Sequence, residues 1–248
     1  MLYEIAKPPV RALMRAVWRP ALTGAHHVPE DGPVVLASNH LAYSDTVILP
    51  ASIERTVFFL GKSDIFTGGN PFNALFARIM RGLHVMPVDR SGGPASSTAI
   101  EAGLAVLAEG KVLGIYPEGT RSPDGRLHRG KTGVARFALA GGAPIVPVGM
   151  VGSFEAQRGR RYLPRRHPRI EVRVGEPIDP EAVVAALPEA SEAEQLRALT
   201  DHVMERITEL SGQDRVDEYA ADVKRRLRAQ RSARRTGRSA SSEADPGA

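Results

Sequence analysis

Short apolar runs rich in β-branched residues alternate along this chain with segments of helical periodicity. Each run has the length of a strand and is bounded by residues that favour turns. Strands that alternate with helices are typical of a parallel sheet with helices on its faces. The pattern therefore predicts an α/β fold with a largely parallel central sheet flanked by helices. The predicted strands cover residues 34–37, 56–60, 83–88, 112–116 and 145–151.

Helix signals fill the intervals between these strands. Three helices are predicted there from capping residues, apolar spacing and terminal glycines. They cover residues 71–80, the segment from Ile100 to the stop signal at Gly110, and residues 131–139.

The character of the chain changes after residue 170. Apolar and charged residues alternate over residues 170–174, which predicts an edge or half-exposed strand. Ser191 and Glu194 form a capping box that begins a long amphipathic helix, and a further helix is predicted over residues 213–228. Residues 229–248 are rich in serine, alanine, glycine and arginine, a composition that predicts a basic disordered tail.

The first 25 residues contain a basic stripe. Arg11, Arg15 and Arg19 recur every four residues, which places them on one side of a helix that we expect to begin at Pro8 and Pro9. Apolar residues occupy the other side. Such a helix suits a membrane interface, but a helix packed on its own domain shows the same pattern.

Composition and charge narrow the class of protein. The 248 residues are 42% apolar and include no cysteine, which fits one large domain, predicted over residues 26–212, in a reducing compartment. The net charge of +5 is a property of the tail, because residues 224–238 hold eight basic residues and no acidic one. No apolar stretch reaches the roughly 20 residues of a membrane-spanning helix. The arginines near the N-terminus also argue against a secretory signal.

A polar cluster that includes His40 and Asp45 follows the first predicted strand. A neutral imidazole can accept a proton from a hydroxyl group near physiological pH. If a helix begins near Ser44, its first turn can bring Asp45 back to the ring, where the carboxylate fixes the tautomer. The alternative is a histidine that caps the strand and an acidic residue at a helix start.

A second polar cluster follows the strand predicted at residues 112–116. Glu118, Gly119, Thr120 and Arg121 combine a permissive backbone, a hydroxyl and a guanidinium, which suits a phosphate or another oxyanion. The alternative is a tight turn with a surface salt bridge. Because the carboxyl ends of parallel strands carry the sites of α/β folds, the two clusters predict a proton acceptor beside an anion site.

These clusters resemble the glycerolipid acyltransferase family, typified by 1-acylglycerol-3-phosphate acyltransferases. The likeness covers about residues 30–150 and rests on four ordered blocks and on Lys131, which precedes the last of them. The blocks are Asn39-His40 with Asp45, Val88-Asp89-Arg90, Pro117-Glu118-Gly119-Thr120-Arg121-Ser122 and Ile145-Val146-Pro147-Val148. Tyr116 stands where many members have phenylalanine.

The resemblance implies acyl transfer from an acyl thioester to the free hydroxyl of 1-acyl-sn-glycerol 3-phosphate, which gives phosphatidic acid. It implies that His40 and Asp45 are catalytic. The residues expected to bind the acceptor phosphate are Arg121, Glu118, Gly119, Thr120 and Arg90. Further possible substrate-binding residues are Asn39, Lys62, Lys131 and Pro147.

The expected partners follow from the same resemblance. The donor would be acyl-CoA or an acyl-carrier protein, as a co-substrate, and no cofactor or metal ion is expected. The N-terminal helix and basic tail would bind the cytoplasmic face of the cell membrane, as a peripheral or monotopic protein.

Three other functions remain open from sequence. The first is a sister acyltransferase that acts on glycerol 3-phosphate, a lyso-aminolipid or another lysolipid. The second is a metal-dependent phosphohydrolase built on His40, Asp45, Asp89 and Glu118, although the spacing lacks a paired-ligand pattern. The third is nucleic-acid binding through the tail and the arginine-rich segment 158–166, which lacks interleaved stacking aromatics.

Overall fold

A seven-stranded sheet forms the centre of the computed structural model, which describes residues 2–62, 78, 84–88, 94–158 and 164–243. The strand order is β1-β8-β7-β2-β5-β3-β4, and every neighbouring pair is parallel except β7 with β8. The predicted largely parallel sheet is therefore confirmed. The strands are β1 (Ala21–Thr23), β2 (Val34–Ser38), β3 (Val57–Lys62), β4 (Val85–Val88), β5 (Val112–Ile115), β7 (Ile145–Val151) and β8 (Glu171–Val174).

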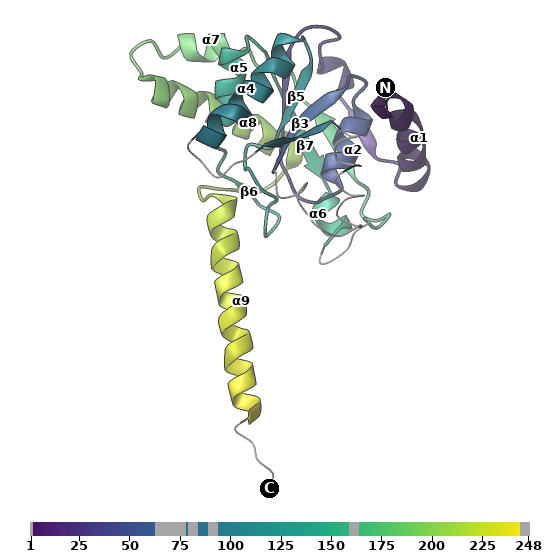
Figure 1. Cartoon of the computed structure of the whole chain (residues 1–248), viewed down its shortest axis with the longest axis vertical. Helices are drawn as coiled ribbons and strands as arrows, with labels where there is room; N and C mark the ends of the chain where they lie inside the picture. The colour runs from purple at the N-terminus through teal and green to yellow at the C-terminus, as the bar shows by residue number, and fades with distance from the viewer. Residues whose placement is uncertain (1, 63–77, 79–83, 89–93, 159–163, 244–248) are drawn as a thin grey trace.

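Helices cover both faces of the sheet, so the domain has three layers (Figure 1). The helices on one face are α4 (Pro94–Ala108), α5 (Gly133–Ala140), α7 (Pro180–Ala185) and α8 (Glu192–Ser211). The helices on the other face are α1 (Leu2–Val17) and α2 (Asp45–Ser52). Apolar side chains form a separate core under each layer, which accounts for the continuous apolar runs of the central strands.

The position of β2 in the middle of the sheet determines where the site lies. It pairs in parallel with β5, from Val34 opposite Val112 to Ala37 opposite Ile115. It also pairs in parallel with β7 on its other side. The segments that follow β2 and β5 therefore emerge side by side at one edge of the sheet.

Helix α1 packs against the domain. It begins at Leu2 and continues through both prolines, so the predicted start at Pro8 and Pro9 is wrong. Met14 is buried in the core, and the indole N–H of Trp18 donates to the carbonyl of Pro164 at 2.9 Å. Among the described residues, none of the helices combines the length and the apolar character needed to cross a bilayer.

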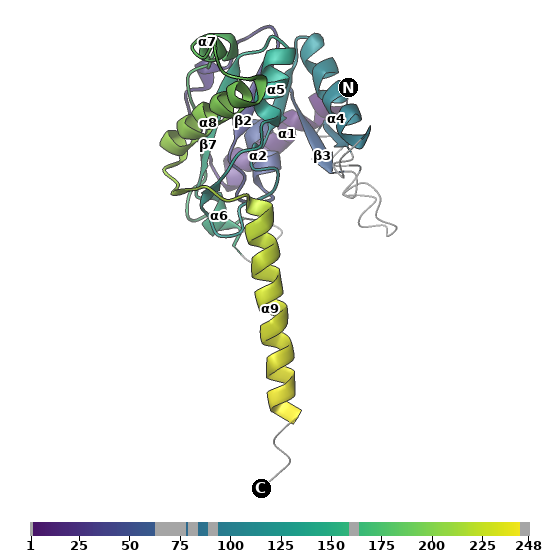
Figure 2. The same cartoon turned by 90° about the vertical axis from the view of Figure 1, so that its left-hand side faces the viewer.

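The last helix, α9 (Ala220–Glu243), extends away from the domain (Figure 2). Sequence predicts a helix over residues 213–228 and disorder over residues 229–248, whereas the helix begins at Ala220 and continues to Glu243. Arginine, alanine and glutamine have high helix propensity. A segment without large apolar side chains cannot form a core, but it can still form a helix. Residues 244–248 lie outside the described part of the chain.

The remaining sequence predictions concern a capping box, one helix and one strand. The capping box at Ser191 and Glu194 is confirmed, whereas the helix predicted over residues 71–80 lies outside the described residues apart from Arg78. Strand β8 is half-exposed but not at the edge, because the three-residue β1 pairs with it. Other short elements lack a clear sequence signal. They are a 3₁₀ turn at Ala25–His27, α6 (Ser153–Ala156), and β6 (Leu127–His128) paired with β9 (Arg215–Val216).

Candidate active site

His40 and Asp45 form a hydrogen-bonded pair at the carboxyl end of β2. Nδ1 of His40 lies 3.1 Å from Oδ2 of Asp45. The His40 side chain is 13% exposed and that of Asp45 is fully buried. With Asp45 ionised, Nδ1 carries the hydrogen, which leaves Nε2 as the basic nitrogen of the imidazole.

Helix α2 holds Asp45 in this position. Asp45 is the first residue of the helix, and its Oδ2 also accepts the backbone N–H groups of Leu41 and Ala42, each at 2.7 Å. The turn between strand and helix thus folds around one carboxylate oxygen. The helix start also favours a negative charge there. The expected return of Asp45 to His40 by the first helical turn is confirmed.

Burial and neighbouring charges keep His40 in its neutral form. Burial lowers the pKa of His40 below its ordinary 6.5, and the positive charges of Arg121 and Lys224 lower it further, whereas Asp45 raises it. The ring stacks on Tyr116, with centroids 4.0 Å apart and planes inclined by 14°. A neutral, oriented imidazole is the form that can accept a proton.

The segment after β5 turns tightly at Gly119. Its φ of +72° favours glycine, and a Cβ there would lie 3.3 Å from the Lys131 side chain. The N–H of Gly119 donates to the carbonyl of Tyr116 at 2.9 Å, and Lys131 donates its own N–H to Pro117 at 2.8 Å. This turn positions Thr120 and Arg121 beyond the end of the sheet.

Two hydrogen bonds join the segments that follow β2 and β5. The N–H of His40 donates to Oε2 of Glu118 at 3.1 Å, and the N–H of Ser122 donates to the carbonyl of His40 at 2.7 Å. The position of the catalytic candidate is therefore determined by both polar clusters.

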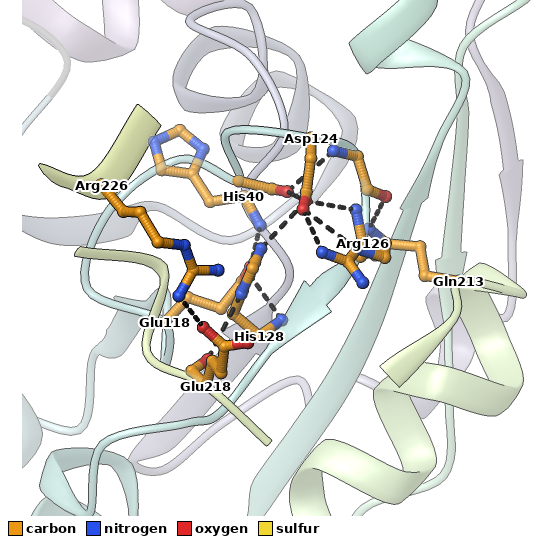
Figure 3. Close-up of polar contacts among 10 residues, drawn as sticks. His40, Glu118, Asp124, Arg126, His128, Gln213, Glu218 and Arg226 are labelled. Carbon is orange, nitrogen blue, oxygen red and sulfur yellow. Dashed lines mark hydrogen bonds and ion pairs between the residues drawn. The ribbon is translucent and has the colours of Figure 1, made fainter. Parts of the chain in front are cut away.

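Glu118, which was predicted to bind the acceptor phosphate, lies buried beneath the site. Its carboxylate is 1% exposed, and its other oxygen, Oε1, accepts the N–H of His128 at 3.0 Å (Figure 3). Burial raises the pKa of Glu118 to about 8. Within the described residues it makes no ion pair with Arg121. Glu118 holds backbone beneath the site rather than facing a substrate phosphate.

A buried histidine extends this support network. His128 Nε2 lies 3.0 Å from Oδ1 of Asp124, and the Asp124 carboxylate accepts two hydrogen bonds from the side chain of Arg126 (Figure 3). Nδ1 of His128 lies 3.3 Å from the carbonyl of Glu218, whose side chain pairs with Arg226. The segment before α9 is thereby connected to the buried residues beneath the site, Glu118 and His128.

Arg121 faces a cavity of about 530 Å³. Its guanidinium lies 3.4 Å from the centre of the Tyr43 ring, which is 57% exposed. The described part of the chain places no carboxylate within ion-pair distance of Arg121. An arginine held on one face by an aromatic ring keeps its N–H groups for an anion. The cavity is lined by Leu41, Ala42, Tyr43, Arg121, Ser122, Pro123, Asp124, Phe154, Gln157 and Arg158.

A family model described as Acyltransferase matches residues 19–151, which is more than half of the chain and includes both polar clusters. The chain belongs to the acyltransferase family.

The chain is also similar in sequence to individual acyltransferases. The chain is 30% identical to the 1-acyl-sn-glycerol-3-phosphate acyltransferase of Bacillus subtilis (strain 168) over 74% of its own length and 84% of that protein. It is 29% identical to the chloroplastic 1-acyl-sn-glycerol-3-phosphate acyltransferase BAT2 of Brassica napus over 53% of its length, but it spans only 37% of that relative.

The fold agrees with a solved acyltransferase. The crystal structure of the 1-acyl-sn-glycerophosphate (LPA) acyltransferase PlsC from Thermotoga maritima superposes with a TM-score of 0.60 at 20% sequence identity. The match covers 84% of this chain and 80% of that chain. At this identity the likeness concerns the fold.

The other predicted site residues of this acyltransferase differ in burial and in their contacts. Asn39 is fully buried, and its side chain exchanges hydrogen bonds with the backbone of Met150 at 2.7 and 2.9 Å, so it fastens β7 beside β2. Pro147 is buried within β7 opposite Ala37 and does not line the cavity. Lys131 is exposed and lies against Gly119.

Two predicted residues have no described side chain. Lys62 ends β3, and only its backbone is described, whereas Arg90 lies outside the described residues. Asp89, which belonged to the phosphohydrolase alternative, also lies outside them. Within the described ranges, His, Cys, Asp and Glu side chains form no group of three with metal-binding geometry.

Sequence reasoning missed Lys224 of α9. Its Nζ donates to Oγ1 of Thr120 at 3.1 Å. A lysine in a basic tail carries no signal that distinguishes it from its neighbours, and only the fold brings it to the turn after β5. Sequence also missed Gln213, whose Oε1 accepts from Nδ2 of Asn39 at 2.5 Å.

Proposed function

We propose that this acyltransferase moves a fatty acyl group from an acyl thioester to the free hydroxyl of 1-acyl-sn-glycerol 3-phosphate, giving phosphatidic acid. The observation that carries the proposal is the His40–Asp45 pair at the same edge of the sheet as Arg121, which lines the cavity. A proton acceptor and an anion-binding residue are the two groups that a phosphorylated alcohol requires.

The proposed reaction is a direct transfer. Nε2 of His40 takes the proton of the acceptor hydroxyl as its oxygen forms a bond with the acyl carbonyl carbon. The C–S bond then breaks, and the departing thiolate takes the proton from the imidazolium. Asp45 stabilises the imidazolium meanwhile, and a base so placed contributes about 10² to 10⁴ in rate.

Arg121 is the proposed first ligand of the acceptor phosphate. A guanidinium can bind two phosphate oxygens through parallel hydrogen bonds. Its rear face rests on Tyr43, so binding requires little further ordering of the side chain.

We also propose that the enzyme works at the cytoplasmic face of the cell membrane as a peripheral or monotopic protein, with acyl-CoA or an acyl-carrier protein as donor. Two observations support this, the exposed Tyr43 at the cavity and the basic composition of α9, and the proposed acceptor is itself a lipid. Helix α6 contributes Phe154 to the cavity lining. In Figure 1, α6 and the start of the basic helix α9 lie at the same end of the domain. Cationic residues contribute about 1 kcal/mol each near an anionic leaflet.

A thiol-release assay tests the proposed reaction. Purified protein is incubated with an acyl-CoA or an acyl-carrier protein and with a panel of lysolipids and glycerol 3-phosphate, and free thiol and new ester are both measured. We expect thiol release that requires 1-acylglycerol 3-phosphate and matches the phosphatidic acid formed. A stronger response to glycerol 3-phosphate or to a lyso-aminolipid would contradict the proposed acceptor and identify a sister reaction.

A variant tests the role of Arg121. Arg121→Met should raise the KM for the phosphorylated acceptor by about tenfold or more, since a charge-assisted pair is lost, and should leave the KM for the donor nearly unchanged. Arg136→Met is the matched control, because Arg136 lies exposed on α5, where it pairs with Glu192. An effect confined to the donor KM would contradict the assignment.

A further inference from the structure

Lys224 reaches the proposed anion site from α9. It lies in the second turn of that helix, where its side chain is partly buried and its Nζ donates to Oγ1 of Thr120 at 3.1 Å. Thr120 belongs to the same turn as Gly119 and Arg121. The contact joins residues separated by more than a hundred positions in the sequence.

The surroundings of Lys224 are cationic. Burial lowers the pKa of Lys224, and the positive charges of Arg121 and Arg228 lower it further. Within the described chain, no carboxylate lies within ion-pair distance of Lys224. Its two neighbours on α9 differ, because Arg225 pairs with Asp222 at 2.8 Å and Arg226 pairs with Glu218 at 2.8 Å.

This arrangement of cations costs free energy unless an anion binds. Like charges held near one another repel, and a partly buried ammonium has lost hydration. A bound anion would reverse both effects. Arg121 and Lys224 each carry one positive charge. A phosphate monoester carries between about −1.5 and −2 charges at neutral pH, so it would neutralise both side chains.

We propose that Lys224 is a second ligand of the acceptor phosphate, placed opposite Arg121 by α9, with the Thr120 hydroxyl between them. The hydroxyl supports this geometry, because its oxygen accepts from Lys224 while its own hydrogen stays free to donate to a phosphate oxygen. This inference rests on the proposed function, and it makes α9 part of the acceptor site.

The position of Lys224 also affects the base. The groups that face His40 are Asp45 from α2, Tyr116 at the end of β5, Arg121 and Lys224. Removing one cation should make protonation of His40 easier. The acidic limb of the pH–rate profile should therefore move to higher pH, an effect that loss of a merely structural contact would not produce.

The experiment compares Lys224→Met with Lys224→Arg and with Arg225→Met. The last variant is the matched control, because it removes one positive charge from the adjacent position of the same helix. Each full-length protein is assayed with a short-chain 1-acylglycerol 3-phosphate that stays monomeric. Binding of sn-glycerol 3-phosphate is measured separately by calorimetry, and circular dichroism verifies the helix content.

We expect Lys224→Met to raise both the acceptor KM and the dissociation constant for sn-glycerol 3-phosphate by about tenfold, the loss of one charge-assisted hydrogen bond. Lys224→Arg should recover most of the affinity, and Arg225→Met should resemble the wild type. Unchanged values in Lys224→Met, or an equal rise in Arg225→Met, would overturn the inference.

The two proposals fail in different ways. A wild-type protein that binds sn-glycerol 3-phosphate but does not acylate the lysolipid would contradict the proposed function. The calorimetric comparison of the variants would still test Lys224. A wild-type protein that binds no phosphate monoester would overturn the inference, whatever acceptor it uses.

Discussion

The backbone N–H of Ser122 donates to the carbonyl of His40 at 2.7 Å, so the turn that carries Arg121 is fastened to the residue proposed as the base. A second bond runs from the N–H of His40 to Glu118. The proton-accepting and anion-binding parts of the site are thus fixed relative to each other through the backbone of His40 and the side chain of Glu118. Substitution of the His40 or Arg121 side chain can therefore remove one function and leave the position of the other.

His40→Ala tests the base. We expect kcat to fall by about 10² to 10⁴, the range for loss of a positioned base, with little change in the melting temperature because the imidazole lies at the edge of the core. Thiol release and thermal unfolding measure the two effects. His202→Ala, an exposed histidine of α8, is the matched control and should keep wild-type turnover. Turnover retained in His40→Ala would contradict the mechanism.

The pH dependence of the reaction should report the pKa of His40. The neutral imidazole is the active form, and its pKa lies below 6.5, so kcat/KM should stay level above that pH and fall as pH decreases through the pKa. Asp45→Asn removes a negative charge that raises this pKa. The acidic limb of the pH–rate profile of Asp45→Asn should therefore move to lower pH, and the kcat of this variant should fall. A limb that moved to higher pH would contradict the pairing.

Glu118→Gln tests the support beneath the site. Glutamine keeps one acceptor oxygen, but its NH₂ group would face one of the two backbone N–H groups that Glu118 now accepts, from His40 and His128. Above the pKa of Glu118, about 8, where both carboxylate oxygens accept, we expect the free energy of unfolding to fall by about 1–3 kcal/mol, the cost of a buried donor without a partner. Urea unfolding measures it.

The matched control for this substitution is Glu205→Gln, at an exposed position of α8, which should unfold like the wild type. In Glu118→Gln, kcat should decrease because His40 is less firmly placed. Stability equal to the wild type, with a raised acceptor KM alone, would instead favour direct contact between Glu118 and the substrate.

A chain that ends at Gln230 tests the basic tail. It keeps Lys224 but lacks Arg231, Arg234, Arg235 and Arg238. We expect weaker co-sedimentation with anionic vesicles, because each cation near such a surface contributes about 1 kcal/mol, and an unchanged KM for a monomeric acceptor. Neutral vesicles provide the control. Undiminished binding to anionic vesicles would contradict a role of the tail at the membrane.

Local pattern was sufficient to predict the sheet, apart from the short edge strand β1, and the His40–Asp45 pair. The strands are short apolar runs, and a parallel sheet places their carboxyl ends at one edge, so the residues that follow β2 and β5 were expected at the same edge. Asp45 could be assigned because a helix start at Ser44 leaves its carboxylate close to His40. Both inferences depend on residues near one another in the sequence.

The partners of Glu118 and Thr120 could not be predicted in this way. Glu118 accepts backbone N–H groups, which every residue but proline possesses and which therefore leave no trace in the sequence. Thr120 meets a lysine of α9, and the order of elements does not indicate where that helix begins relative to the sheet. The composition of residues 229–243 does not reveal their helical state, because it shows that the segment cannot form a core but does not exclude a helix.

The segment between α8 and α9 extends the working unit of the enzyme beyond the 19–151 match to the family. Gln213 contacts Asn39, β9 pairs with β6, and the carbonyl of Glu218 meets the buried His128. A nick in this connector would leave every residue of the family blocks in the chain. It would nevertheless weaken the contacts that support the backbone beneath His40. Proteolytic sensitivity between Gly212 and Ala220 should therefore report on the integrity of a site formed by residues much earlier in the sequence.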